Sequence, residues 1–191
     1  MNMIKQEQIV KNTKKYFQTA QEQGFMTEEL MAFLGENFIK APASTMSDLH
    51  NAFEGGLIDH LLRVTKYAVS INETILPENL KLQKKDIIKV CFLHQIGKAH
   101  LYTPCTSEWH IKNQGKMYDF NDSLTSMRVG ERSAHYALNN GVTLTEEEYQ
   151  AIINFDKDDS DKQAKYHNSL LGDLLKMANQ LAITEEKNQK N

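Results

Sequence analysis

The chain has 191 residues, a formal net charge of −3 and 40% hydrophobic residues. This length suffices for one ordinary domain with a hydrophobic core, and the charge provides no basic field of the kind that binds long nucleic acids. No apolar stretch approaches the roughly 20 residues that cross a bilayer. The first residues lack a basic segment followed by an apolar run, so no secretory signal is expected. With only two cysteines, we expect a reduced, cytoplasmic protein that does not enter membranes.

The first part of the chain predicts two helices. Residues 5–23 are polar, with apolar positions on one side, and indicate an amphipathic helix. Thr27 is a suitable N-cap for a short helix that continues to Phe38, because a threonine hydroxyl accepts from the unpaired N–H groups of the first turn. Residues 1–40 are therefore expected to form N-terminal helices that pack on the core.

Two apolar helices are predicted next. After a break at 41–45, an apolar stripe over 57–71 indicates a long amphipathic helix. Gly55 and Gly56 precede it, and glycine suits a tight turn where a side chain would block a close backbone approach. Residues 84–96 are apolar almost all round and predict the most buried helix.

The pattern then changes to that of a small β-hairpin. Apolar residues flank Asn-Gln-Gly at 113–115, which predicts a hairpin near 107–120 with glycine in its turn. A helix follows over 123–140, with Gly141 placed for a left-handed C-cap. Thr145 and Glu148 have the spacing of a capping box, which predicts the start of another helix.

The last part of the chain predicts an acidic loop over 156–161, a final helix over 166–182 and a frayed tail over 184–191. With no repeat and no composition break, residues 41–183 are expected to form a single domain. The predicted fold class is therefore all-α, a helical bundle with one small β-hairpin.

Two short segments contain histidines in distinctive surroundings. Residues 54–60 read Glu-Gly-Gly-Leu-Ile-Asp-His, and residues 93–98 read Leu-His-Gln-Ile-Gly-Lys. With Pro-Ala-Ser-Thr at 42–45 and Gly-Glu-Arg-Ser at 130–133, in that order, the chain resembles the HD superfamily. Members of this superfamily are helical, metal-dependent phosphohydrolases named for a His-Asp doublet. The resemblance covers 42–181 and implies an HD-domain-like bundle.

The resemblance also implies which residues would hold the metal. His60 and His94 match histidine ligands of the family, but Gln95 stands where the doublet has Asp. In an ungapped comparison, Val129 and Phe155 stand near later histidines, and Asn179 stands where the last helix supplies Asp. Divalent ions favour carboxylate ligands, and two histidines with an amide supply no negative charge. No metal, cofactor or catalytic residue is therefore predicted. The remaining histidines show no spacing typical of a metal site: His50, His100, His110, His135 and His167.

A pocket that has lost its carboxylates would keep cationic and hydrogen-bonding side chains. Arginine and lysine bind phosphate, amides both donate and accept hydrogen bonds, and a tyrosine ring can stack on a base. We therefore predict a binding site for a phosphate-bearing small molecule, such as a nucleotide or cyclic nucleotide signal. Its predicted residues are His60, Arg63, His94, Gln95, Lys98, Tyr102, Arg128, Arg132 and Asn179.

Three functions remain open at this point. The first is a catalytically inactive HD-like binding protein, and similar small proteins of phages imply one that sequesters a host signal. The second is a metal-dependent nucleotide phosphohydrolase in which Asp156 or a neighbouring carboxylate completes a rerouted metal site. The third is a protein–protein interaction scaffold, including a possible homo-oligomer. Metal dependence and nucleotide affinity distinguish the three.

Overall fold

The computed structural model describes residues 6–157 and 168–189. Within these residues the fold consists of eight α-helices, two short 3-10 helices and one two-stranded antiparallel sheet. The predicted fold class, mainly helical with one small pair of strands, is confirmed. None of the helices in the described part of the chain is long and apolar enough to cross a membrane.

The elements follow one another along the chain in a simple order. The α-helices are α1 (Gln6–Glu22), α2 (Glu28–Lys40), α3 (Gly56–Thr74), α4 (Lys84–Leu93), α5 (Glu108–Gln114), α6 (Val129–Asn139), α7 (Glu146–Asn154) and α8 (Leu170–Asn188). The 3-10 helices are η1 (Glu78–Leu80) and η2 (Ile96–Lys98). Strand β1 (Tyr102–Pro104) pairs with β2 (Tyr118–Phe120) so that Thr103 lies opposite Asp119.

Local capping explains where several helices begin and end. Thr27 Oγ1 accepts a hydrogen bond of 3.0 Å from Leu30 N at the start of α2. At the start of α7, Thr145 Oγ1 accepts from Glu148 N at 3.2 Å, and Thr145 N donates to the Glu148 carboxylate at 2.8 Å. Gly141 adopts the left-handed conformation, with φ of 81°, just after α6. The predicted caps at these positions are confirmed.

The segment expected to form the hairpin turn is a helix instead. Ser107 caps the start of α5, and Gly115, with φ of 65°, ends it as a left-handed C-cap. The strands β1 and β2 lie on either side of this helix. Glycine serves a hairpin turn and a helix C-cap equally well, because both need a positive φ. The predicted pair of strands is thus confirmed, but the predicted hairpin turn between them is wrong.

Two helix boundaries also differ from the prediction. Helix α6 begins at Val129, because residues 123–128 form an irregular segment before it. The tail predicted to fray from 184 continues α8 to Asn188, and Glu186 is only 1% exposed. The buried carboxyl group of Glu186 bonds to His60 and so ties this last turn to the core. The predicted loop over 158–161 and the predicted start of the last helix at 166 lie outside the described residues.

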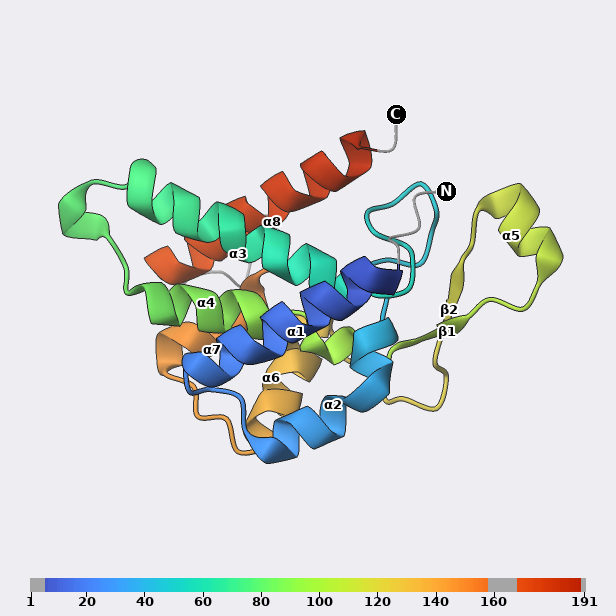
Figure 1. The fold of residues 1–191 in the computed structure, drawn as a ribbon, viewed down its shortest axis with the longest axis horizontal. Coiled ribbons are helices and arrows are strands. Elements are labelled where there is room, and N and C mark those ends of the chain that lie inside the picture. Colours follow the sequence, from blue (N-terminus) through green and yellow to red (C-terminus); the bar gives the residue numbers. More distant parts are fainter. Residues whose placement is uncertain (1–5, 158–167, 190–191) are drawn as a thin grey trace.

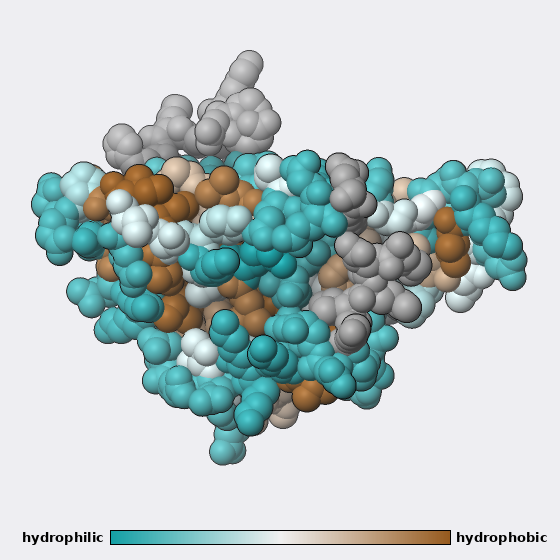
Figure 2. Space-filling view, turned by 45° about the horizontal axis from the view of Figure 1, so that its top comes forward, coloured by the Kyte–Doolittle hydropathy of each residue, from teal (hydrophilic) through white to brown (hydrophobic). Residues whose placement is uncertain are grey.

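Packing places α3 at the centre of the bundle. It packs along α8 and α4, while α1 and α2 also contact it. Figure 1 shows α8 crossing behind α3, α1 in the foreground of the bundle, and α5 with its two strands projecting from one end. Figure 2 shows a face that is largely hydrophilic, with the larger hydrophobic patches toward the end opposite α5. Six of the ten residues of α4 are buried, which agrees with the predicted buried helix.

Candidate functional site

Four of the predicted site residues meet inside the bundle. His60 lies on α3, His94 and Gln95 follow the end of α4, and Asn179 lies on α8. All four are buried, and both histidines are completely inaccessible to solvent. Because these residues come from three helices that pack on one another, the tertiary fold joins them into one group, which we call the imidazole–amide cluster.

Hydrogen bonds define the tautomer of His94. Its Nδ1 lies 2.8 Å from the carbonyl oxygen of Cys91, so Nδ1 carries the hydrogen and donates it. Its Nε2 therefore has a free lone pair, which accepts a hydrogen bond of 3.1 Å from Gln95 Nε2. Burial lowers the pKa of His94 to about 3, so the ring is neutral at physiological pH.

His60 joins the cluster to a buried carboxyl group. Its Nε2 lies 3.0 Å from Asn179 Oδ1, and its Nδ1 lies 3.0 and 3.1 Å from the two carboxyl oxygens of Glu186. The Asn179 oxygen only accepts, so Nε2 carries the hydrogen and Nδ1 has the lone pair. The 3.1 Å contact between Gln95 Nε2 and His60 Nε2 then joins two donors and is no hydrogen bond. Gln95 Nε2 instead donates to Asn179 Oδ1, at 3.2 Å.

The electrostatics of this pair agree with that tautomer. Burial raises the pKa of Glu186 to about 8, against the opposing charge of Arg63. Burial also lowers the pKa of His60 to about 3, and the charge of Lys98 lowers it further. The Glu186 carboxyl is thus protonated near neutral pH and donates to the neutral His60 ring. The pair shares one proton, as a coupled buried pair does.

The imidazole–amide cluster does not fit the metal site that the HD resemblance implies. It contains no carboxylate, and Gln95 directs its N–H groups toward the cluster where a cation would need lone pairs. Gln95 Oε1 is buried without a hydrogen-bond partner. A buried polar atom without a hydrogen-bond partner lowers the stability of the fold by about 1–3 kcal/mol. The cluster therefore links the helices, and Gln95 does not supply the lone pair that a divalent ion would need at the HD position.

Two of the predicted cationic residues lie near this cluster but are engaged by protein groups. Lys98 is buried and its Nζ donates to the carbonyl oxygen of Ala43 at 2.5 Å. Burial lowers the pKa of Lys98 to about 8. Arg63 forms ion pairs with Asp59 at 3.2 Å and with Glu185 at 2.6 Å. Neither side chain presents an unoccupied charged group for phosphate.

The other three predicted residues line a separate cleft of about 510 Å³. Tyr102 comes from β1, Arg128 from the residue before α6, and Arg132 from α6 itself. We call this the arginine cleft. Arg132 is only 4% exposed; its Nη2 donates to the Thr125 carbonyl at 2.5 Å, while its Nε has no hydrogen-bond partner. Arg128 Nη2 lies 3.5 Å from the Asp156 carboxylate, which also lines the cleft.

Val129 and Phe155, which the resemblance placed near family histidines, and the neighbouring Asp156 do not form a metal site with His60 and His94. The Phe155 ring packs edge-on against the His94 ring, with centroids 4.7 Å apart. Val129 lines the arginine cleft. Asp156 lies beside Arg128, so the structure places it with the arginines and not among the histidines.

Sequence reasoning missed two residues near His60. His50 lies in the loop before α3, and its ring centroid is 5.0 Å from that of His60. Glu186 bonds to His60 from 126 positions away. In the sequence, the Gly55-Gly56 pair indicated that the preceding loop approaches the start of α3 closely. A Cβ on Gly56 would lie 2.2 Å from the Asn51 carbonyl oxygen. This confirms the close backbone approach expected from the two glycines.

Comparisons with models of protein families, with curated proteins and with solved structures find no match to this chain.

Proposed function

We propose that this protein binds a phosphate-bearing small molecule, such as a nucleotide, in the arginine cleft and does not hydrolyse it. The observation that carries this proposal is Arg132, which is buried at the cleft with its Nε–H unpaired. A guanidinium has five donors in a planar fork that matches phosphate. An unpaired buried donor is costly, so an anion that bonds to it gains that energy on binding.

The cleft has the chemistry that a nucleotide needs. Arg128 is half exposed and can exchange Asp156 for a phosphate, because their 3.5 Å contact is long for a strong ion pair. Arg132 lines the same cleft and retains an Nε–H without a hydrogen-bond partner. Tyr102 on β1 also lines the cleft and supplies an aromatic ring that can stack on a base.

The resemblance to the HD superfamily supports a binding role over a hydrolytic one. It aligned His60, His94, Gln95 and Asn179 with residues that share one site in that family, and these side chains do contact one another here. With Gln95 in the doublet, this cluster lacks the carboxylates that would activate water on a metal. An HD-like scaffold that has lost its catalytic metal is consistent with a protein that captures a phosphorylated signal, as a phage-type sequestering protein would.

Isothermal titration of AMP, ATP and a cyclic nucleotide in the presence of EDTA tests this proposal. We expect binding that persists without divalent ions and weakens about tenfold or more in Arg132→Gln and Arg128→Gln, since a charged hydrogen bond contributes about 1.5–3 kcal/mol. Lys112→Gln, on the exposed face of α5, is the matched control and should bind like the wild type. Absence of binding, or equal affinity in all three variants, would reject the cleft as the site.

The same preparations separate the remaining alternatives. Turnover of any nucleotide that appears only with a divalent ion would favour a rerouted phosphohydrolase. Absence of nucleotide binding together with a concentration-dependent mass in native mass spectrometry would favour an interaction scaffold or a homo-oligomer.

A further inference from the structure

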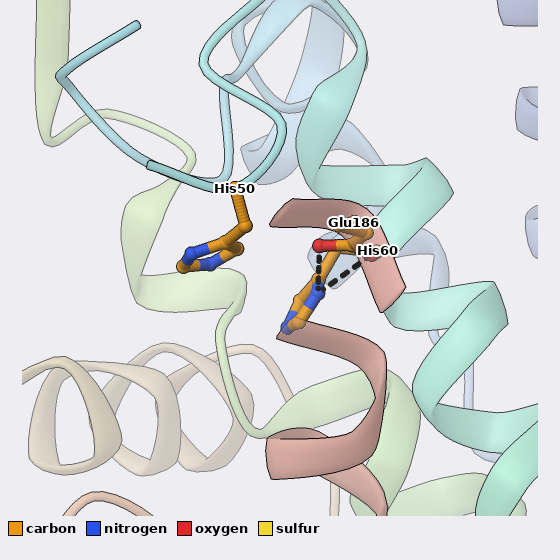
Figure 3. Close-up of side chains that lie close together, drawn as sticks. All are labelled: His50, His60 and Glu186. Atoms are coloured by element: carbon orange, nitrogen blue, oxygen red, sulfur yellow. Dashed lines mark hydrogen bonds and ion pairs between the residues drawn. The ribbon is translucent and has the colours of Figure 1, made fainter. Parts of the chain in front are cut away.

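Three side chains from separate segments lie close together around His60. His50 comes from the loop before α3, His60 from α3, and Glu186 from the last turn of α8 (Figure 3). A ring nitrogen of each histidine and a carboxylate oxygen of Glu186 all lie within 4.8 Å of one another. We propose that this triad binds a divalent transition-metal ion, with Zn²⁺ as its best ligand. This site is separate from the arginine cleft and does not rest on the function proposed there.

The distances require little movement to admit the ion. Zinc bonds of about 2.0–2.2 Å in tetrahedral geometry separate neighbouring ligand atoms by roughly 3.3 Å. His60 Nδ1 already lies 3.0 and 3.1 Å from the two oxygens of Glu186. The ring nitrogen of His50 lies up to 4.8 Å from the other two ligand atoms, so it would have to approach them by about 1.5 Å. His50 is half buried and lies in the loop before α3.

The second nitrogen of His60 is held as metal-binding histidines usually are. Histidine ligands commonly donate their other ring N–H to an oxygen, which fixes the tautomer and directs the lone pair at the metal. His60 Nε2 donates to Asn179 Oδ1 at 3.0 Å, and Gln95 Nε2 holds the same oxygen at 3.2 Å. The lone pair of Nδ1 therefore points toward Glu186, where the ion would replace the hydrogen between them.

Arg63 contacts the carboxyl groups around the triad and leaves one oxygen of Glu186 for a cation. Arg63 lies within 3.2 Å of carboxylate oxygens from Asp59, Glu185 and Glu186. One guanidinium thus faces three carboxyl groups, of which Glu186 is protonated near neutral pH. Arg63 approaches oxygen Oε1 of Glu186, which leaves Oε2 for the ion. On binding, the ion would take the place of the Glu186 proton, which would be released to solvent.

The backbone next to His50 is held in an unusual conformation. Asn51 has φ of 44°, in the left-handed region that few residues other than glycine adopt. Its side chain donates to Asp59 Oδ2 at 3.0 Å and to the Gly56 carbonyl at 3.3 Å. These bonds stabilise the strained turn and hold the loop against α3, so that His50 remains beside His60.

The ligand set selects the ion. Two imidazoles and one carboxylate suit Zn²⁺ and other transition metals, whereas Mg²⁺ and Ca²⁺ prefer oxygen ligands throughout. Three protein ligands leave a fourth position for water. A bound ion would tie the loop before α3 and the end of α8 to α3.

Titration of ZnCl2 into the EDTA-stripped, dialysed full chain tests this proposal, with MgCl2 titrated in parallel and the thermal unfolding temperature recorded at each zinc concentration. We expect one Zn²⁺ per chain, an unfolding temperature that rises with zinc, and no comparable effect of magnesium. His50→Ala and Glu186→Gln should each weaken zinc binding by about tenfold or more. His135→Ala, an exposed histidine of α6, is the control and should bind as the wild type does.

Each possible result decides the proposal. A wild-type chain that binds no zinc overturns it, and so does a His50→Ala variant with wild-type zinc affinity. If Glu186→Gln unfolds at lower temperature but keeps its zinc affinity, His60 and Glu186 form a structural pair only. Because His50 lies on a half-buried loop, the His50→Ala variant is expected to fold and remains decisive if Glu186→Gln does not.

Discussion

The contact between Gly97 and α6 allows a sharp test of the packing that joins the two candidate sites. Gly97 lies in η2, directly after the doublet, and its N donates to Ser133 Oγ at 2.9 Å. A Cβ at Gly97 would lie 2.8 Å from the Val129 carbonyl oxygen, 2.9 Å from Arg132 Cβ and 2.9 Å from Ser133 N. Two of these three atoms belong to the backbone of α6, so they cannot rotate away. Gly97→Ala must therefore push α6 away from η2.

The expected cost follows from these contacts. Overpacking a filled interior costs about 1–3 kcal/mol, and the reduced entropy of the unfolded chain with alanine offsets about 0.4–1 kcal/mol of it. A net loss of about 1–2 kcal/mol lowers the unfolding temperature of a chain of this size by roughly 2–8 °C. Since α6 carries Arg132, the same variant should also bind phosphate compounds more weakly.

Thermal unfolding followed by far-UV circular dichroism measures this effect, with Gly172→Ala as the matched control. A Cβ at Gly172 would lie 3.5 Å from Ser169 Oγ and 3.6 Å from Ala151 Cα, which is ordinary contact. In helix α8, replacing this glycine by alanine should stabilise by about 0.5–1 kcal/mol. The two substitutions should therefore change the unfolding temperature in opposite directions. An unfolding temperature of Gly97→Ala at or above that of the wild type would refute the reasoning.

Two further predictions concern buried polar groups. The pKa of Lys98 is lowered to about 8 in the folded state, so between about pH 8 and 10.5 the unfolded chain binds more protons and this group makes the fold more stable as pH rises. Urea unfolding should show the wild type gaining about 2 kcal/mol relative to Lys98→Met between about pH 7 and pH 10; parallel pH profiles would contradict this. Tyr16, fully buried, donates to the Phe92 carbonyl at 3.0 Å, so Tyr16→Phe should lose about 1–2 kcal/mol of unfolding free energy in the same assay, and an unchanged midpoint would be the contrary result.

The helices were largely readable from the sequence because their signals are local. The capping box of Thr145 and Glu148 and the hydroxyl cap of Thr27 each join atoms within three residues. Such bonds depend on short-range geometry that residue type alone specifies. The segment around Gly115 was misread for the same reason, since a positive φ suits both a turn and a helix end. Only the distant pairing of β1 with β2 distinguishes the two.

The candidate sites depended on tertiary structure instead. The nine predicted ligand residues separate into a buried cluster with its neighbours and a cleft, because the packing of α6 against η2 places Arg128 and Arg132 apart from His60. The sequence alone determined that an amide, Gln95, follows His94 where the HD resemblance implies a carboxylate, since the two residues are adjacent. Only the fold could bring Glu186 to His60 across 126 positions, because the contact requires α3 and α8 to pack along each other, and that packing is set by burial over their whole length.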